Sequence, residues 1–295
     1  MNKTINNIYV VAEIGCNHMG DMNIAKKMIE IAALYCNVNA VKFQKRCIKE
    51  LLNDQQYNAP HPNPKNAFGK TYGKHREALE FNIAQHKELF DYCKENNITY
   101  TASVWDFTSA MEIASLQPKY IKIPSASNTN YHMLKWLCEN YFGEIHLSLG
   151  MTSLEEEENI IKLFIDSHRN KDLVLYACTS GYPVPYNETC IMEIIRLKEK
   201  YGDIIKKIGY SGHHIGISID NAIAALGAEV IERHFTLNKD WKGTDHKASL
   251  LPNEMKELVN ELKLIPEIMC YKQEEILPIE KIQRTKLKTY KEIYV

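Results

Sequence analysis

Along this chain, short apolar runs alternate with longer segments in which apolar residues recur at helical spacing. Eight of the runs are five to eight residues long and rich in Val, Ile, Tyr and Thr, a composition typical of buried parallel strands. The predicted strands cover residues 8–15, 40–44, 99–104, 120–125, 145–150, 173–179, 208–212 and 230–236.

The segments between these runs are predicted to be amphipathic helices. They lie at residues 24–35, 84–95, 154–164, 191–201, 219–226 and 253–265. In the first of them, Met28, Ile31 and Tyr35 fall on one face, and Asp21 is placed to cap its N-terminus. Strands that alternate with helices indicate a parallel sheet, and eight repeats favour a closed (β/α)8 TIM barrel over an open sheet. We expect residues 1–282 to form this barrel domain and residues 283–295 to be a short basic tail.

One connection, at residues 45–85, shows no strand pattern and is predicted to be a long structureless loop. It follows the second strand, so it would lie on the barrel face that carries active sites. Lys70, Lys74 and Arg76 lie in it beside glycines and aromatic residues. The loop is interpreted as a contact to an anionic substrate, and the alternative is a solvated surface excursion.

Composition narrows the classes of partner. The chain has 295 residues, 45% of them hydrophobic, and a formal net charge of −1. That charge offers no overall field to attract nucleic acid or an anionic membrane, so neither is expected as a partner. No run reaches the roughly 20 apolar residues of a membrane helix, and no signal peptide is evident. The eight cysteines form no CxxC pair and are expected to be reduced, which predicts a cytoplasmic protein.

Polar and ionisable residues gather where the predicted strands end. These residues are Glu13, Lys42, Gln44, Ser103, Lys122, Ser125, Ser148, Ser180, Tyr182, Ser211, His213 and His234, followed by Asp245 in the last long loop. Charged groups within apolar strands are costly unless they are paired or functional, and barrel active sites form at these strand ends.

Two chemical subsets stand out among them. The lysines and serines together could hold a phosphate and a carboxylate at once. His213 and His234 come from consecutive strands, and either they ligate a divalent ion such as Mn²⁺ or they are two unrelated core histidines. The residues alone therefore predict a metal-assisted enzyme that acts on a small phosphorylated acid.

Several segments resemble a known family in the order in which they occur. Residues 11–21 (VAEIGCNHMGD) resemble the AEIGxNHxGD opening of the sialic acid synthases. Further similar motifs are 41–44 (VKFQ), 147–151 (LSLGM), 178–183 (CTSGYP), 210–213 (YSGH), 232–237 (ERHFTL) and 242–250 (KGTDHKASL). The resemblance extends from about residue 8 to residue 285.

This resemblance implies a reaction in which phosphoenolpyruvate condenses with an N-acylmannosamine to give a sialic-acid-like nonulosonate and phosphate. It implies that Lys42, Lys122, Ser103, Ser125, Ser148, Ser180 and Ser211 hold phosphoenolpyruvate. It also implies that His213 and His234 bind Mn²⁺ or Mg²⁺, that Glu13 and Asp245 contact the sugar, that Tyr182 lines its pocket, and that Gln44 and Glu232 support these groups.

The segment 69–76 (GKTYGKHR) is similar to the animal-type branch of the family, which uses the 6-phosphate of the sugar and makes a 9-phosphate. We therefore expect Lys70, Lys74 or Arg76 to meet a sugar phosphate.

Two departures from the family pattern leave alternatives open. The family usually continues into an antifreeze-protein-like domain that swaps between subunits, and this sequence stops where the linker would begin. A homodimer through the barrel, or a separate chain that supplies the domain, is expected. In addition, Ser127 stands where the family usually has an acid. The alternatives are a phosphoenolpyruvate-dependent synthase for a different aldose and a degenerate barrel without catalysis.

Overall fold

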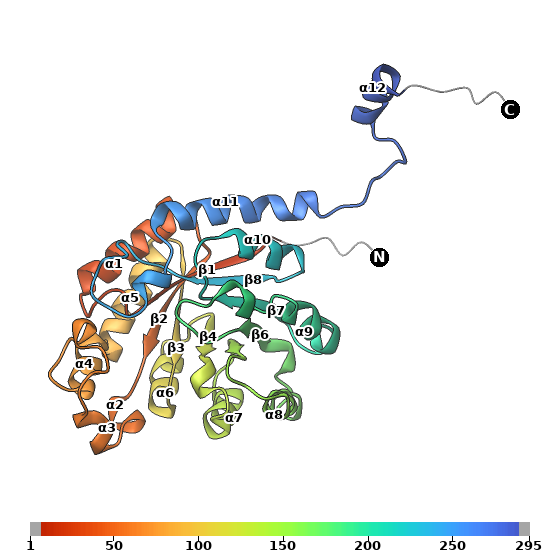
Figure 1. Ribbon diagram of the computed structural model, residues 1–295. Helices are drawn as coiled ribbons and strands as arrows, with labels where there is room; N and C mark the ends of the chain where they lie inside the picture. Colours follow the sequence, from red (N-terminus) through yellow and green to blue (C-terminus); the bar gives the residue numbers. More distant parts are fainter. Residues whose placement is uncertain (1–6, 289–295) are drawn as a thin grey trace.

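The computed structural model describes residues 7–288 and has a closed barrel of eight parallel strands at its centre, with helices around it (Figure 1). The strands follow one another round the barrel in sequence order. They are β1 (Tyr9–Gly15), β2 (Ala40–Lys45), β3 (Thr99–Val104), β4 (Tyr120–Ile123), β5 (Glu144–Ser148), β6 (Leu173–Cys178), β7 (Lys207–Gly212) and β8 (Val230–His234). The predicted (β/α)8 barrel is confirmed.

The predicted ends of some strands are wrong by one to two residues. β4 ends at Ile123 instead of residue 125, because Pro124 has no N–H to donate to the ladder and Ser125 begins a 3₁₀ turn. β8 ends at His234, and only Phe235 forms a further isolated bridge, with Leu250.

The six predicted helices are present with small shifts. They are α1 (Met22–Glu30), which continues as a π-helical turn at Ile31–Tyr35, and then α5 (Ile83–Glu95), α8 (Leu154–Asp166), α9 (Glu193–Tyr201), α10 (Ser218–Ala225) and α11 (Pro252–Ile268). Asp21 caps α1 by accepting hydrogen bonds from the amides of Asn23 and Ile24. The structure adds α6 (Phe107–Ser115) and α7 (Tyr131–Asn140), which the periodicity analysis did not predict.

The connection at residues 45–85 is not structureless, and that prediction is corrected. It contains the short helices α2 (Ile48–Leu51), α3 (Asp54–Asn58) and α4 (Tyr72–Leu79). Asn53 caps α3 in a capping box, and the Thr71 hydroxyl caps α4. The segment is therefore an ordered excursion over the active-site end of the barrel.

Residues inside the barrel alternate along each strand, as the pleat requires. On β4 and β6, Tyr120 and Val174 lie near the amino-terminal end, and Lys122 and Tyr176 lie one step further along. The amino-terminal layer is apolar and aromatic, whereas the layers nearer the carboxyl ends are polar. The apolar side chains between the strands and the outer helices form the main hydrophobic core.

After α11 the chain leaves the barrel. Helix α12 (Pro278–Leu287) stands apart from the barrel body (Figure 1). The predicted boundary between barrel and tail, after residue 282, falls inside this helix, and residues 289–295 of the predicted tail lie outside the described residues. Within residues 7–288, no helix is both long and apolar enough to cross a membrane.

Candidate active site

A cavity of about 260 Å³ opens where the barrel strands end. Most of the residues singled out in the sequence line it: Glu13, Lys42, Gln44, Ser103, Lys122, Ser125, Ser148, Ser180, Tyr182, Ser211, His213 and His234. The wall is completed by Trp105, Pro124, Ala126, Met151, Cys178 and Glu232. Residues far apart in the sequence meet here because the carboxyl ends of all eight strands lie on one face.

Glu232 is the electrostatic centre of this inner cavity. Its Oε1 lies 2.9 Å from Lys42 Nζ and 3.0 Å from Lys122 Nζ, and it accepts a 3.1 Å hydrogen bond from the Ser211 hydroxyl. Lys42 Nζ also donates to Ser103 Oγ at 2.8 Å and lies 3.3 Å from Glu13 Oε2. All six side chains are buried. The cavity floor is therefore a closed ionic network rather than a set of separate charges.

Burial and neighbouring charges set the protonation of this network. Burial opposes the charge of Glu232, but Lys122 and Lys42 outweigh it and hold the pKa of this carboxyl far below its usual range. Burial lowers the pKa of Lys122 to about 8, with Glu232 acting against the shift. Burial also disfavours the charged form of Lys42, but the nearby Glu13 and Glu232 outweigh this effect and raise the pKa of Lys42. Burial raises the pKa of Glu13 despite the nearby Lys42. Burial thus disfavours the charge of Glu13, which weakens the repulsion that an incoming anion meets from this carboxyl.

Gly150 shapes the wall beside Ser125 and Ser180. A Cβ at this position would lie 2.4 Å from Ser180 Oγ and 2.7 Å from Ser125 Oγ, so a side chain here would displace both hydroxyls. The Gly150 amide donates to Ser125 Oγ at 3.0 Å. A glycine here therefore lets hydroxyls from two different strand ends lie close together, and such donors suit phosphate or carboxylate oxygens.

A second, outer cavity of about 510 Å³ adjoins the first, and Gln44, Trp105, Tyr182 and His234 line both. Asp245 and Arg76 line the outer cavity. The Arg76 guanidinium donates to the Tyr72 hydroxyl at 2.7 and 3.0 Å.

The other two cations predicted in this region lie elsewhere. Lys70 and Lys74 are exposed and line neither cavity, and Lys74 pairs with Glu77 at 2.7 Å. Of the three cations named in the sequence, the structure brings only Arg76 to the site.

Arg46 was not predicted as a site residue from the sequence. It lines the outer cavity and is connected to Glu13 of the inner cavity through Gln44. Its guanidinium lies 3.9 Å from the ring centre of Trp105, pairs with Glu80 at 3.1 Å and donates to Gln44 Oε1 at 2.5 Å. Gln44 in turn donates through Nε2 to Glu13 Oε1 at 2.8 Å. Arg46 thus fixes which end of the Gln44 amide faces Glu13. Its place one residue after β2 was the available signal.

His213 and His234 come together as the sequence suggested, with ring centres 5.4 Å apart. His213 Nδ1 lies 3.0 Å from the carbonyl oxygen of Thr179, which can only accept, so Nδ1 carries the proton and the Nε2 lone pair is available. Burial lowers the pKa of His213 to about 3, which leaves the ring neutral. His234 Nδ1 is buried without a hydrogen-bond partner in the described part of the chain.

Two imidazoles are suitable ligands for a divalent ion, but they are only part of a coordination sphere. Within residues 7–288, no group of three or more His, Cys, Asp or Glu side chains is arranged to hold a metal ion. Water or substrate oxygens would have to supply the remaining ligands.

Comparison with known proteins agrees with this geometry. The sequence model of the NeuB family matches residues 28–274. The chain belongs to the NeuB family. It is 36% identical to the N-acetylneuraminate-9-phosphate synthase of Mus musculus over 279 residues, which are 95% of this chain and 76% of the mouse protein. It is 37% identical to the N,N'-diacetyllegionaminic acid synthase of Campylobacter jejuni over 270 residues, 91% of this chain and 78% of that protein.

A solved structure is also similar throughout. It is the N-acetylneuraminic acid (sialic acid) synthetase of Leptospira borgpetersenii, in complex with citrate, with a TM-score of 0.80 and 28% identity. The match covers 96% of this chain and 93% of the Leptospira chain. The similarity therefore extends over nearly all of the chain.

This NeuB barrel departs from the expected family pattern at Ser127. Its hydroxyl donates to the backbone oxygen of Trp105 at 2.8 Å, and its side chain is buried. Ser125 and Ala126 line the inner cavity, whereas Ser127 does not. Ser127 therefore holds the ends of β3 and β4 together and presents no acid to a substrate.

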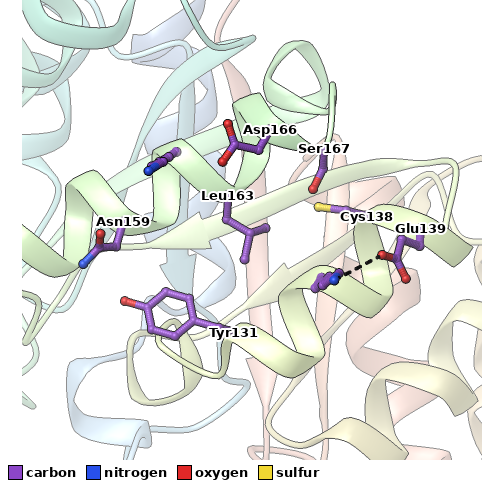
Figure 2. Close-up of a pocket in the computed structure, with 9 residues that line it drawn as sticks. Tyr131, Cys138, Glu139, Asn159, Leu163, Asp166 and Ser167 are labelled. Carbon is purple, nitrogen blue, oxygen red and sulfur yellow. Dashed lines mark ion pairs between the residues drawn. The ribbon is translucent and has the colours of Figure 1, made fainter.

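Another hollow, of about 760 Å³, lies on the outer surface of the NeuB barrel between α7 and α8 (Figure 2). Tyr131, Leu163 and Asp166 line it, and its Lys135 and Glu139 are exposed and 4.0 Å apart. No residue at a strand end contributes to it, so it is separate from the candidate active site.

Proposed function

We propose that this protein condenses phosphoenolpyruvate with an N-acylmannosamine, or with its 6-phosphate, to give a nonulosonate, or its 9-phosphate, and phosphate. The observation that carries the proposal is the inner cavity. Its wall contains a buried pair of lysines, the two hydroxyls beside Gly150, and two histidines, one of which also lines the outer cavity. Membership of the NeuB family and the named activities of the mouse and Campylobacter relatives support the same reaction.

In this proposal, phosphoenolpyruvate occupies the inner cavity. Lys42 and Lys122 neutralise its charges, and the hydroxyls of Ser103, Ser125, Ser148, Ser180 and Ser211 donate to its phosphate and carboxylate oxygens. Each lysine has three N–H donors, and Glu232 satisfies part of this capacity. An anion that enters the cavity exchanges water for fixed charges in a site of low dielectric.

The sugar occupies the outer cavity with its aldehyde directed inward. Glu13, Asp245 and Tyr182 contact it, and Gln44 holds Glu13 in place. The electron pair of the enol double bond forms a bond from C3 of phosphoenolpyruvate to the aldehyde carbon, and the aldehyde oxygen takes up a proton. Water then adds at C2. The C2–O bond of the tetrahedral intermediate breaks, so that phosphate leaves with the bridging oxygen and C2 becomes a carbonyl.

His213 and His234 would hold a divalent ion, Mn²⁺ or Mg²⁺. Such an ion supplies Lewis acidity toward the aldehyde oxygen of the sugar. The hydrogen bond from His213 Nδ1 to the Thr179 carbonyl keeps Nε2 unprotonated for this role, and Tyr182, with its ring centre 4.3 Å from that of His213, limits how far the ring can turn.

The proposal includes recognition of a sugar phosphate by Arg76. Its guanidinium lies in the outer cavity and, within residues 7–288, forms no ion pair with a carboxylate. A planar guanidinium suits phosphate oxygens. Replacing Arg76 by Gln should lower kcat/KM for the 6-phosphate by about ten- to a hundred-fold, since hydrogen bonds to charged groups contribute about 1.5–3 kcal/mol. The unphosphorylated sugar should be much less affected, and K74Q, at an exposed residue outside the cavities, serves as control.

The direct experiment is phosphate release from phosphoenolpyruvate with Mn²⁺, with N-acetylmannosamine and its 6-phosphate compared and the nonulosonate identified by mass. A His213→Ala variant should lose turnover while it still binds phosphoenolpyruvate. Full activity of that variant would contradict the metal assignment, and equal activity of the wild type on both sugars would contradict a dedicated phosphate contact at Arg76.

A further inference from the structure

Below the inner cavity lies a group of aromatic and polar side chains for which the proposed reaction has assigned no role. Lys122 Nζ rests 3.9 Å above the ring centre of Tyr176. Tyr176 comes from β6, is fully buried and points into the barrel one layer below the substrate cavity. A cation at this distance over an aromatic face is attracted by the ring's electron density.

The position of the ring is determined by its surroundings. On β7, the residue beside Tyr176 is Gly209, and a Cβ there would lie 3.0 Å from two ring carbons of Tyr176. A larger residue at Gly209 would therefore displace the ring. From the other side, the Tyr176 hydroxyl lies 2.7 Å from His146 Nδ1, and the His146 ring stacks on Tyr120 with centres 3.9 Å apart.

The direction of these hydrogen bonds follows from the protonation states. Glu144, at the amino-terminal end of β5, lies 3.4 Å from His146 Nε2 and 3.1 Å from Lys206 Nζ. The hydrogen bond from His146 lowers the pKa of Glu144 to about 2, so this group is a carboxylate and only accepts. Burial lowers the pKa of His146 to about 4, so the neutral ring carries its one proton on Nε2. His146 Nδ1 must then accept from the Tyr176 hydroxyl.

We propose that Tyr176 is a positioning residue for Lys122: its ring, oriented through His146 by Glu144, holds the lysine ammonium at the floor of the phosphoenolpyruvate cavity. The ring face attracts the Lys122 ammonium by its electron density. A carboxylate or carbonyl in the same place would instead accept a hydrogen bond from one of the three N–H groups of the ammonium. One N–H meets Glu232 at 3.0 Å, and the others remain free to donate to a substrate anion. This role depends on the proposed function only where substrate binding is concerned.

Several other groups act on the same ammonium and must be separated from the effect of the ring. Glu232 on β8 attracts it, whereas Lys42 on β2 repels it. The Cys178 thiol on β6 favours its charge, and His146 on β5 is neutral. Burial lowers the pKa of Lys122 to about 8 even with the ring in place. Weakening the attraction of the ring should therefore lower that pKa further.

The test changes the electron density of the ring and leaves its shape alone. Tyr176 is replaced by Phe and then by phenylalanines that carry one, two and three fluorine atoms. The Lys122 pKa is measured from the lysine ¹³Cε NMR signal, assigned by its loss in K122R, and the phosphoenolpyruvate Kd is measured by calorimetry at pH 8. Phe keeps the ring face but loses the hydrogen bond to His146, so it should lower the Lys122 pKa and raise the Kd less than any fluorinated ring does, and it is the reference for the fluorine series.

Along the fluorine series, the Lys122 pKa should fall step by step, by about half a unit to one unit in total, and the Kd at pH 8 should rise by about two- to five-fold as the charged fraction of Lys122 falls. Val174→Ala is the matched control, since it removes packing in the adjacent layer, and it should lower the melting temperature without moving either value. A flat fluorine series, or an equal pKa shift in Val174→Ala, would overturn the inference. Wild-type protein that does not bind phosphoenolpyruvate would instead contradict the proposed function, while the NMR series would still decide the role of Tyr176.

Discussion

Replacing Glu232 by Gln should show how strongly the ionic network is coupled to the stability of the barrel. The substitution keeps the shape of the side chain and removes the negative charge that Lys42 and Lys122 share at 2.9 and 3.0 Å. Removing one partner of a buried ion pair costs about 3–5 kcal/mol, because the remaining charge is left uncompensated. Lys42 keeps Glu13 at 3.3 Å, so the loss falls mainly on Lys122.

Deprotonation of Lys122 limits this cost. Its pKa is already about 8, so at pH 7 a further fall of one unit is enough to begin neutralising it. Each unit corresponds to about 1.4 kcal/mol, which places the expected loss near the lower end, at about 3 kcal/mol. For a chain of 295 residues that is a fall in melting temperature of about 5 °C. Ser211→Ala, which removes one hydrogen bond to the same oxygen, should cost about 1–2 kcal/mol.

The pH dependence gives a second, independent readout by differential scanning calorimetry. The pKa of Glu232 in the folded protein lies far below its ordinary value of 4.5, so its stabilisation is fully present above that value and is lost as the pH falls below it. In E232Q, Lys122 is partly neutral at pH 7 and regains its proton as the pH falls toward 5, so the difference in melting temperature between wild type and E232Q should rise slightly over this range. It should then shrink below pH 4.5, where the stabilisation by Glu232 is lost from the wild type. Equal melting temperatures at pH 7, or a difference that keeps growing below pH 4.5, would refute the reasoning.

Three further predictions follow from individual contacts. The affinity for phosphoenolpyruvate should be steady below pH 7 and should fall as Lys122 loses its proton above about pH 8, whereas K122R should keep its affinity at pH 9. Calorimetry across this pH range measures both, and a constant wild-type affinity would contradict the assignment. Ser127→Ala should cost about 1 kcal/mol of stability through the lost bond to Trp105 and leave kcat within about twofold, and a much larger fall in kcat would give Ser127 a chemical role. Arg46→Met should raise KM for the sugar by about tenfold or more and leave the Kd of phosphoenolpyruvate unchanged, because Arg46 orients Gln44, and through it Glu13, by hydrogen bonds. A selective loss of phosphoenolpyruvate binding would contradict the placement of Glu13 at the sugar.

The barrel could be predicted from the sequence because its strands are buried on both faces and therefore read as continuous apolar runs. Where the prediction failed, a local feature outweighed the pattern, as when Pro124 ended β4 early. Helices α3 and α4 were missed because they are short, and a helix of that length depends on its cap, here Asn53 or Thr71, and on tertiary contacts more than on periodicity.

The polar residues that line the site could be predicted from the sequence, but the residues that position them could not. Lys42, Lys122 and the two histidines stood out because ionisable groups are rare in apolar strands. Tyr176 did not, since a tyrosine in a strand is ordinary and nothing in the sequence shows that a cation rests on its ring. Arg46 and Trp105 each follow a strand directly, but only the fold brings β2 and β3 close enough for the two side chains to stack.

The most direct test of the proposed reaction uses phosphoenolpyruvate labelled with ¹⁸O at the bridging C2–O position, incubated with Mn²⁺ and N-acetylmannosamine or its 6-phosphate. If water adds at C2 and the C2–O bond breaks, all of the label appears in inorganic phosphate, and a nonulosonate that contains three more carbons than the sugar forms in equal amount. Label retained in a three-carbon acid, with phosphate released by P–O cleavage and no nonulosonate formed, would contradict the assignment of this barrel as a phosphoenolpyruvate-dependent synthase.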